Sequence, residues 1–314
     1  MKVIIQIPCL NEEKTLPLVL KSIPKKIKGV DSVEVLIIDD GSTDKTIEVA
    51  KKHGVKHFVL HKKNMGLARS FHDGINYALE NGADIVVNTD GDNQYPQNRI
   101  SDLVQPILDG KAEIVIADRQ TAKIAHFSPL KKLLQRIGSG VVNKAAGTKL
   151  PDAASGFRAY SKESLLRLNI ITKFSYCMET IIQAGNKNIP IESIKVVTNK
   201  KTRESRLFKN IWQHMYKSGA AIFRSYIMYR PHLIFNTLGT MLSVLGLVPF
   251  VRYGYLMLVL NDQGQHIQSL LLGAVVLFVA MISFALAIIA DIQRTNRTLT
   301  EDSLERLKRL QYEK

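Results

Sequence analysis

Two long runs of uncharged, apolar residues near the carboxyl end limit the folds that this chain can adopt. They are Leu233–Val251, with 19 residues, and Leu270–Ala290, with 21. A helix of about 20 apolar residues matches the hydrocarbon thickness of a bilayer. A buried core helix is the alternative interpretation, but two such runs at one end of a chain favour a pair of transmembrane helices.

The charges around these runs predict an orientation. The segment that joins them, 252–269, holds one Arg, one Asp and one His, and the outer flanks carry Arg224, Arg230, His232, Arg294 and Arg297. Because cytoplasmic loops carry an excess of Lys and Arg, both outer flanks are expected in the cytoplasm. The chain is therefore expected to be an integral membrane protein with its large amino-terminal part in the cytoplasm.

The formal net charge of +15 is concentrated in the middle of the chain. Residues 120–232 contain 20 basic and 5 acidic residues, whereas residues 1–119 contain 16 and 17. A basic surface attracts anionic lipids, phosphorylated substrates or nucleic acid. The position directly before the membrane segment favours lipid, and no zinc-finger or helix-turn-helix pattern supports a nucleic-acid partner. A basic helix from Phe208 to about Met228 is expected to lie against the membrane surface.

The first 120 residues alternate between strand and helix patterns. Short β-branched runs, typical of strands buried on both faces, are Val3–Ile7, Val33–Asp39, His57–Leu60, Ile85–Asp90 and Ile114–Ala117. Helical patterns are Glu13–Ser22, Thr43–His53, Leu67–Glu80, Arg99–Asp109 and, further on, Pro129–Ala146. Ser42 or Thr43 is the expected cap of the second helix. This order predicts an α/β domain with a mainly parallel sheet.

Polar and acidic residues follow three of these strands. They are Asn11-Glu12-Glu13, Asp39-Asp40 and Asp90-Gly91-Asp92. A single Asp-Gly is often only a turn. In open parallel sheets, however, ligands bind at the carboxyl ends of the strands, so three clusters at equivalent ends indicate a ligand site. The carboxylates of Asp90 and Asp92 can share a Mg²⁺ or Mn²⁺ ion that also takes substrate phosphate oxygens.

The histidines and cysteines indicate neither a zinc site nor a disulfide framework. His53, His57 and His61 lie at uneven spacing without a zinc pattern and are expected to be surface residues. Two cysteines, Cys9 and Cys177, form no disulfide framework, which favours a reducing compartment.

Several motifs, taken in order and spacing, resemble glycosyltransferase family 2. They are Ile7-Pro8-x-x-Asn11-Glu12-Glu13, Leu36–Asp44, Asn64-x-Gly66-Leu67 and Asp90–Gln94. A second group is similar to the dolichyl- and polyprenyl-phosphate sugar transferases: Val115–Arg119, Asp152-x-x-Ser155-Gly156-Phe157-Arg158 and Arg203–Leu207. The resemblance covers about residues 3–212.

This resemblance implies a GT-A (Rossmann-like) nucleotide-sugar fold and a metal-dependent, inverting transfer. The implied donor is a UDP- or GDP-linked sugar, and the implied acceptor is undecaprenyl or dolichyl phosphate. Donor-nucleotide residues are implied to be Pro8, Asn11, Glu12, Asp40, Asp90 and Gln94, with the metal on Asp90 and Asp92. Phosphate or acceptor residues are implied to be Arg119, Arg158, Arg203, Ser205 and Arg206.

Asp152 and Asp92 are the implied catalytic acids. A phosphate monoester is already largely ionised at neutral pH, with a second pKa of about 6, and needs little help from a base. Asp152 therefore either deprotonates the acceptor or only orients Arg158.

Two other functions stay open. The enzyme can act on another membrane acceptor, such as a diacylglycerol or a polysaccharide, although the Gln-x-x-Arg-Trp motif of processive synthases is missing at Trp212, the only tryptophan. A non-catalytic membrane adaptor is disfavoured because Asp40, Asp90, Asp92 and Asp152 are all present.

The expected domains are a catalytic domain, 1–206; a basic juxtamembrane helix, 207–232; two transmembrane helices, 233–292; and a cytoplasmic tail, 293–314, helical after Thr298. Homo-oligomers formed through the membrane helices are a further open expectation.

Overall fold

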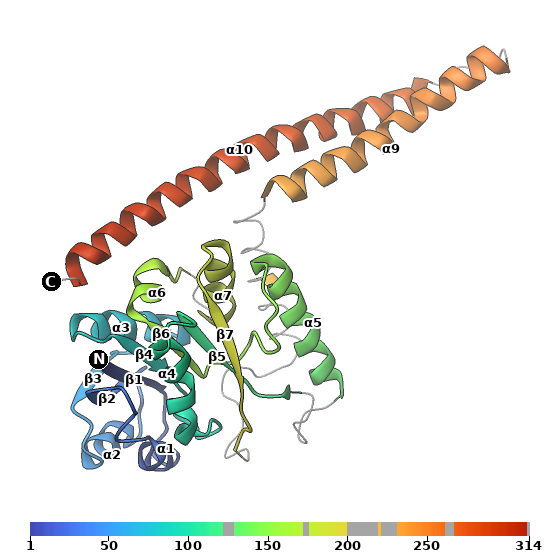
Figure 1. Cartoon of the computed structure of the whole chain (residues 1–314). Helices are drawn as coiled ribbons and strands as arrows, with labels where there is room; N and C mark the ends of the chain where they lie inside the picture. The colour runs from blue at the N-terminus through green and yellow to red at the C-terminus, as the bar shows by residue number, and fades with distance from the viewer. Residues whose placement is uncertain (122–128, 172–175, 200–218, 221–230, 261–266, 313–314) are drawn as a thin grey trace. The chain divides into compact units, whose positions relative to one another are not determined.

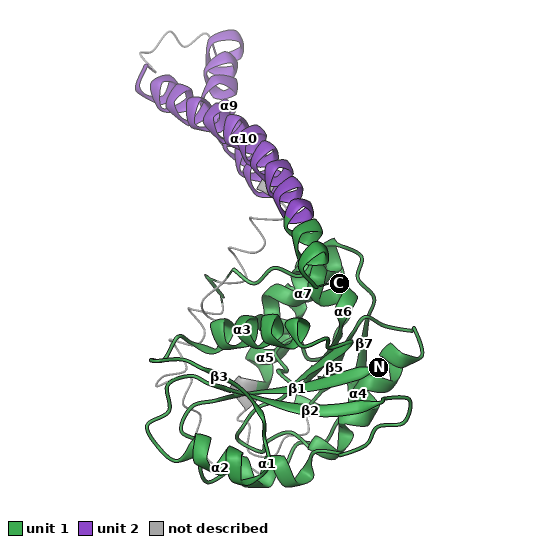
Figure 2. Cartoon of the chain, turned by 90° about the vertical axis from the view of Figure 1, so that its left-hand side faces the viewer, with its two compact units in different colours: residues 1–225, 304–314 green, residues 226–303 purple. Residues whose placement is uncertain are grey.

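The computed structural model of the chain describes residues 1–121, 129–171, 176–199, 219–220, 231–260 and 267–312. It divides into two compact units (Figure 2). The first comprises Met1–Ser225 with Leu304–Lys314, and the second comprises Tyr226–Ser303. The predicted basic helix at 208–228 lies outside the described residues, apart from residues 219–220.

A seven-stranded sheet forms the centre of the first unit, in the order β3-β2-β1-β4-β6-β5-β7 (Figure 1). The strands are β1 Lys2–Cys9, β2 Ser32–Asp39, β3 His57–Leu60, β4 Ile85–Asn88, β5 Ile114–Asp118, β6 Arg158–Ser161 and β7 Ile191–Lys195. All neighbouring pairs are parallel except the two that involve β6. The predicted α/β class with a mainly parallel sheet is confirmed.

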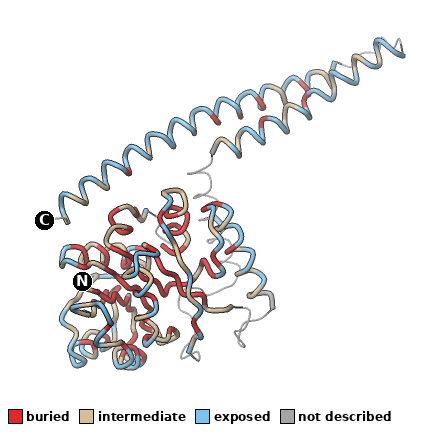
Figure 3. Tube along the Cα trace, viewed as in Figure 1, coloured by how far each residue is buried: buried red, intermediate tan, exposed pale blue. Residues whose placement is uncertain are grey.

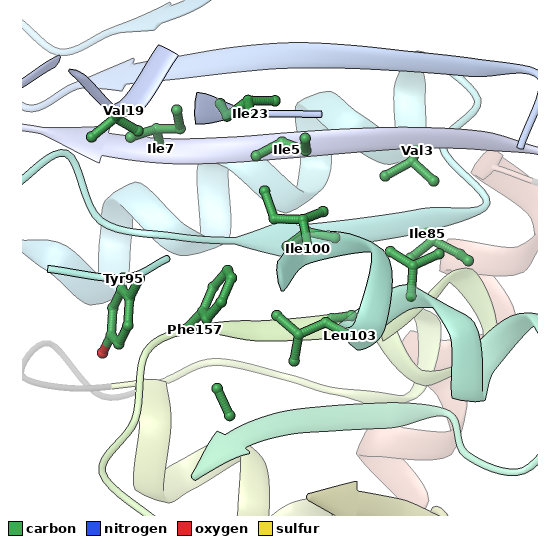
Figure 4. Close-up of a cluster of buried hydrophobic side chains, with 14 of the residues drawn as sticks. Val3, Ile5, Ile7, Val19, Ile23, Ile85, Tyr95, Ile100, Leu103 and Phe157 are labelled. Carbon is green, nitrogen blue, oxygen red and sulfur yellow. The ribbon is translucent and has the colours of Figure 1, made fainter. Parts of the chain in front are cut away.

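Helices cover both faces of this sheet, which explains why its strands are apolar on both sides. On one face, the side chains of Val3, Ile5 and Ile7 pack with Val19 and Leu103 into the main hydrophobic core (Figure 4). Buried residues follow the strands closely, as Figure 3 shows. Helices α1 Leu16–Ser22, α2 Thr46–Lys52 and α4 Ile100–Leu108 contribute to this core, and α3 Leu67–Glu80 covers the other face.

The second helix begins later than its sequence pattern predicts. Helix α2 starts at Thr46 and has Lys45 at its N-cap, without a side-chain cap. The predicted capping residues Ser42 and Thr43 instead bind Asn11: the Asn11 amide donates to Ser42 Oγ at 2.9 Å, and the Thr43 amide donates to Asn11 Oδ1 at 2.7 Å. Contacts between two loops therefore replace the expected local cap.

The remainder of the first unit contains elements that the sequence did not predict as such. These are β6, β7, α6 Lys162–Arg167 and α7 Tyr176–Asn186, whereas α5 Pro129–Ala146 has its predicted bounds. β6 is short and begins with an arginine, so it lacks an apolar strand pattern. It enters the sheet because it pairs antiparallel with both β4 and β5.

Two long helices make up the second unit, α9 Pro231–Val259 and α10 Ile267–Tyr312, and α10 continues into the first unit. Both are long and apolar enough to cross a membrane, as predicted. They meet at small residues: a Cβ on Gly273 would lie 2.9 Å from the Gly246 carbonyl oxygen. The predicted helical tail is not separate, because α10 runs through it to Tyr312.

The last turns of α10 bind α6 within the first unit. Arg309 donates from Nη1 to Glu163 Oε2 at 3.0 Å and also pairs through Nη2 with Glu163 Oε1. Lys308 donates to the Leu168 carbonyl at 2.6 Å, and Lys162 donates to the Tyr312 carbonyl at 2.9 Å. Side chains of both segments thus attach the end of α10 to the rest of the first unit.

Candidate active site

The three predicted clusters of polar residues lie at the carboxyl ends of adjacent strands β2, β1 and β4. Asn11 and Glu12 follow β1, Asp40 follows β2, and Asp90 follows β4 by two residues. A Cβ on Gly91 would lie 3.2 Å from both Cys9 Sγ and Glu12 Cγ, so the loop after β4 packs directly against the loop after β1. The residues at these strand ends therefore form one contiguous edge.

Hydrogen bonds join the loops after β1 and β2. Glu12 is buried; its amide donates to Thr46 Oγ1 at 2.8 Å, and its Oε2 accepts from Thr15 Oγ1 at 2.6 Å. Asn11 has a φ of 57°, a left-handed conformation that Asn adopts more readily than most residues. Hydrogen bonds within the protein thus fix the conformation of the loop that carries Asn11 and Glu12.

Asp40 organises the segment between β3 and α3. Its buried carboxylate accepts hydrogen bonds from the amides of Met65, at 2.7 Å, and Gly66, at 2.9 Å. His61 Nδ1 lies 2.8 Å from the same carboxylate. Gly41, at φ +80°, has the Lys63 backbone against it, and a Cβ there would lie 2.8 Å from the Lys63 carbonyl carbon. The second strand end and the entrance to α3 are therefore packed as one piece.

His61 is a residue that sequence reasoning missed. Its imidazole lies between two carboxylates, with Nε2 3.2 Å from Asp73 Oδ2, and its side chain is only 9% exposed. The expectation of a surface histidine is thus wrong for His61, because α3 brings Asp73 to the strand end. His57 is also partly buried and pairs with Glu34 at 3.0 Å, whereas His53 is exposed.

The Asp90–Gln94 loop is held by a hydrogen bond within the loop and by hydrogen bonds from Asn199. The Gln94 amide donates to Asp92 Oδ1 at 3.0 Å, and Asn93 has a φ of 59°. Asn199, which follows β7, donates from Nδ2 to the Asn93 carbonyl at 3.0 Å. The backbone amide of Asn199 also donates to the Gln94 carbonyl at 2.9 Å. Sequence reasoning missed Asn199, since nothing local links it to a loop a hundred residues earlier.

Gly156 attaches a further loop, 152–157, beside Asp90. Its amide donates to Tyr95 Oη at 3.0 Å, and its carbonyl accepts from Asn88 Nδ2 at 2.9 Å and from Tyr176 Oη at 3.3 Å. A Cβ on Gly156 would lie 3.6 Å from both carboxylate oxygens of Asp90. The glycine thus permits a close approach that brings the loop of Asp152 to the predicted metal residue.

Asp152 and Arg119 form an ion pair at the end of β5. Arg119 donates from Nε to Asp152 Oδ2 at 2.6 Å and from Nη2 to Oδ1 at 2.9 Å, which is the two-point geometry that suits a carboxylate. Burial by itself raises the pKa of Asp152, but the charge and hydrogen bonds of Arg119 outweigh it and lower this pKa below its ordinary value. The carboxyl group is therefore ionised and paired.

Arg158 does not lie where a phosphate ligand is expected. It is fully buried and donates to the carbonyls of Ala153, Ser155 and Cys177 and to Thr180 Oγ1, at 2.6–2.9 Å. A phosphate would have to displace these bonds. The alternative that Asp152 orients Arg158 is also wrong, because Asp152 pairs with Arg119 instead.

Some of the remaining predicted residues are described by the structure and others are not. Pro8 lies near the end of β1, and Gln94 is the last residue of the Asp90–Gln94 loop. Arg203, Ser205 and Arg206 lie outside the described residues. Among the described residues, no group of three or more His, Cys, Asp or Glu side chains converges as in a metal site made by protein alone.

Comparison with known proteins identifies the family. The model of "Glycosyl transferase family 2" matches residues 4–168, more than half of the chain. The chain belongs to glycosyltransferase family 2. This membership confirms that the protein is a glycosyltransferase, and the match covers all three polar strand ends as well as Asp152.

Curated relatives of this glycosyltransferase include enzymes named for lipid phosphates. The UDP-N-acetylglucosamine–dolichyl-phosphate N-acetylglucosaminyltransferase of Methanococcus voltae is 27% identical over 213 residues, 61% of this chain and 83% of the relative. The undecaprenyl-phosphate mannosyltransferase of Micrococcus luteus is 28% identical over 176 residues, 54% of this chain and 70% of the relative.

Solved structures support the GT-A fold of this glycosyltransferase. The glucosyl-3-phosphoglycerate synthase of Mycobacterium tuberculosis, in complex with Mn²⁺, UDP-glucose and phosphoglyceric acid, matches with a TM-score of 0.55 and 22% identity. The match covers 72% of this chain and 78% of that one.

Proposed function

We propose that this glycosyltransferase moves a hexosyl group from a nucleoside-diphosphate sugar to a polyprenyl phosphate at the cytoplasmic face of a membrane. The observation that carries the proposal is the convergence of acidic loops with an arginine–aspartate pair at one edge of the sheet. The loop of Asp152 lies against Asp90 through Gly156, and Tyr95 contacts that loop. The names of the relatives and the two apolar helices support a lipid-linked acceptor.

A divalent cation fits the residues of the Asp90–Gln94 loop. Mg²⁺ and Mn²⁺ prefer oxygen ligands and are usually held by one or two carboxylates together with substrate phosphates. Asp90 and Asp92 supply two carboxylates on one short loop, so a third protein ligand is not required. A cation held there would neutralise charge on the departing diphosphate. Asp90 and Asp92 are thus the proposed metal residues.

The protein's own groups then position the two substrates. Asn11, Glu12 and Asp40 border the proposed nucleotide site, and Gln94 lies beside the donor. The acceptor phosphate attacks the anomeric carbon from the face opposite the leaving group. Its new C–O bond forms as the bond to the nucleoside diphosphate breaks, which inverts the configuration. Arg119 is placed by Asp152 to bind a phosphate of donor or acceptor.

Asp152 is better suited to positioning than to proton abstraction. Its low pKa makes it a weak base, and the acceptor phosphate is largely ionised at neutral pH. We therefore propose that Asp152 orients Arg119. Its role as a base stays a prediction that the geometry does not require.

The test is nucleoside diphosphate release by the purified full chain in detergent. The reaction contains short polyprenyl phosphate, Mg²⁺ or Mn²⁺, and a panel of UDP- and GDP-sugars. We expect lipid-dependent release from one donor, lost in Asp92→Asn and retained in the matched control Asp102→Asn, whose carboxylate is exposed and pairs with Arg99. Nuclear magnetic resonance of the product anomer tests inversion.

Other outcomes point elsewhere. Release that is indifferent to the lipid contradicts the proposed acceptor and leaves the diacylglycerol or polysaccharide alternatives. No release and no nucleotide binding with any donor contradicts the whole proposal.

A further inference from the structure

Helix α5 has an apolar face that is exposed in the part of the chain that the structure describes. Leu133 and Ile137 are each 54% exposed and Val141 is 44% exposed. They are spaced four residues apart and therefore lie on one side of the helix. Gly140 lies on the same side, and a Cβ there would meet no atom within 4 Å. Three branched apolar side chains in one row are unusual on a surface that faces only water.

The opposite side of α5 is packed and anchored, so the helix is not loosely attached. Val142 and Ala145 are buried, and Ser139 Oγ accepts a hydrogen bond from the Ala153 amide at 3.2 Å. Gly185 of α7 lies against the end of α5, so closely that a Cβ there would overlap the Ala146 carbonyl oxygen. The inner face is thus fixed against α7 and the loop of Asp152, and the orientation of the outer face is fixed with it.

Basic residues accompany the exposed apolar row. Arg136 and Lys144 are exposed, and Lys132 is half-buried. Residues 129–149 contain no acidic residue, and their basic residues are Lys131, Lys132, Arg136, Lys144 and Lys149. Apolar side chains with Lys and Arg beside them are the pattern of helices that lie in the interface of anionic membranes. A protein partner would need a groove that is both acidic and apolar. An anionic bilayer offers negative charge and apolar chains everywhere on its surface.

We infer that the outer face of α5, defined by Leu133, Ile137 and Val141, docks on the surface of an anionic lipid bilayer. The apolar row enters the boundary between head groups and acyl chains, and the neighbouring basic residues bind lipid phosphates. Since α5 is anchored to the loop of Asp152, this contact holds the candidate active site at the level of the lipid head groups. The inference goes beyond the proposed reaction, because it does not depend on the sugar or the acceptor.

The test measures lipid contact residue by residue in the full chain. Ile137→Cys and Leu133→Cys are each labelled with an environment-sensitive fluorophore; the native Cys9 and Cys177 are buried and react little. The control is Lys51→Cys, at an exposed position on α2. Each protein is placed in nanodiscs of phosphatidylcholine, with or without phosphatidylglycerol, that contain a spin-labelled quencher lipid.

We expect blue-shifted emission and strong quenching at positions 133 and 137, but neither at position 51. Quenching should be greater with phosphatidylglycerol and weaker at high salt, because the basic residues act through screened charge. Quenching at positions 133 and 137 no greater than at position 51 overturns the inference. A blue shift without lipid quenching also overturns it, because the face is then covered by protein, either a second copy or another partner. Unchanged thermal unfolding of each labelled protein verifies the fold, and a failure of the transferase assay leaves this result unaffected.

Discussion

Several polar residues at the candidate site have protein partners that hold them in place. Asp40 accepts hydrogen bonds from two amides and from His61, and Asp152 is paired with Arg119. Buried carboxylates need such partners, because an isolated charge in the interior is costly. We therefore expect His61 and Asp152 to act on substrates only through their partners, Asp40 and Arg119.

We predict that His61 positions the donor through Asp40. His61→Ala removes a hydrogen bond to a charged group and should raise the KM for the sugar nucleotide about tenfold, equivalent to roughly 1.4 kcal/mol, with a smaller change in kcat. The measurement is steady-state kinetics with varied donor. His61→Asn, whose amide can still donate to Asp40, should restore part of the affinity.

His57→Ala is the matched control for His61. His57 begins strand β3, which ends just before His61, and it also pairs with a carboxylate, that of Glu34, but it makes none of the contacts with Asp40. An equal rise in KM for both alanine variants would show that the effect is merely structural.

The Arg119–Asp152 pair predicts a dependence of stability on pH. The folded-state pKa of Asp152 is lowered, so its contribution to stability is present above the ordinary aspartate value near 3.8 and is lost as the pH falls through the lower folded value. Arg119→Gln leaves a buried carboxylate unpaired and should destabilise the protein by about 3–5 kcal/mol at neutral pH. On acidification this difference should shrink, because protonation removes the unpaired charge.

Thermal unfolding of wild type and Arg119→Gln in detergent, from neutral pH to about pH 3, measures this effect. A difference in unfolding temperature that stays constant over the range would contradict the assigned pairing.

At the level of elements, glycines decide which segments approach closely. In the second unit, a Cβ on Gly246 of α9 would lie 3.1 Å from the Leu277 amide nitrogen and 2.9 Å from its side chain. Small residues let membrane helices pack backbone against backbone. The α9–α10 contact therefore depends on positions that carry no side chain.

We predict that Gly246→Val forces α9 and α10 apart. Overpacking of this kind typically costs about 1–3 kcal/mol, so the thermal unfolding temperature of the full chain in detergent should fall. Gly254→Val is the control, because Gly254 lies on the same helix and a Cβ there would meet no atom within 4 Å. Equal losses in the two variants would mean that valine weakens the helix itself and not the contact.

On the scale of the whole molecule, the chain returns to its first unit after the two apolar helices. Residues 304–312 bind α6 through Arg309–Glu163 and two side chain–carbonyl hydrogen bonds. The first unit is thus completed by the last turns of α10, although more than a hundred residues separate these turns from α6 in the sequence.

We predict that Glu163→Arg releases the end of α10. Partly exposed ion pairs contribute about 0.2–1 kcal/mol, so amide hydrogen exchange of residues 304–312 should accelerate severalfold. The double variant Glu163→Arg with Arg309→Glu should restore protection. Asp302→Arg makes the same charge change at an exposed position of α10 and should have no such effect; equal acceleration there would indicate a general charge effect.

The features that could be predicted from the sequence are those that depend on local pattern. Apolar runs of strand length predicted β1 to β5, and uncharged runs of about 20 residues predicted the two long helices, since bilayer thickness sets that length. The rule that ligands bind at the carboxyl ends of parallel strands was enough to predict that Asn11, Asp40 and Asp90 share one edge of the sheet.

Tertiary structure alone decided the contacts between segments far apart in the chain. His61 lies between two carboxylates because α3 brings Asp73 beside it, and Asn199 binds the Asp90–Gln94 loop because β7 ends next to that loop. Arg158 is fully buried and its guanidinium donates hydrogen bonds to Cys177 and Thr180 of α7. This burial cannot be read from the sequence motif. Residue type and spacing indicate the chemistry available, whereas burial and partners, which depend on packing, decide whether a side chain is left to meet a substrate or is used to hold the fold.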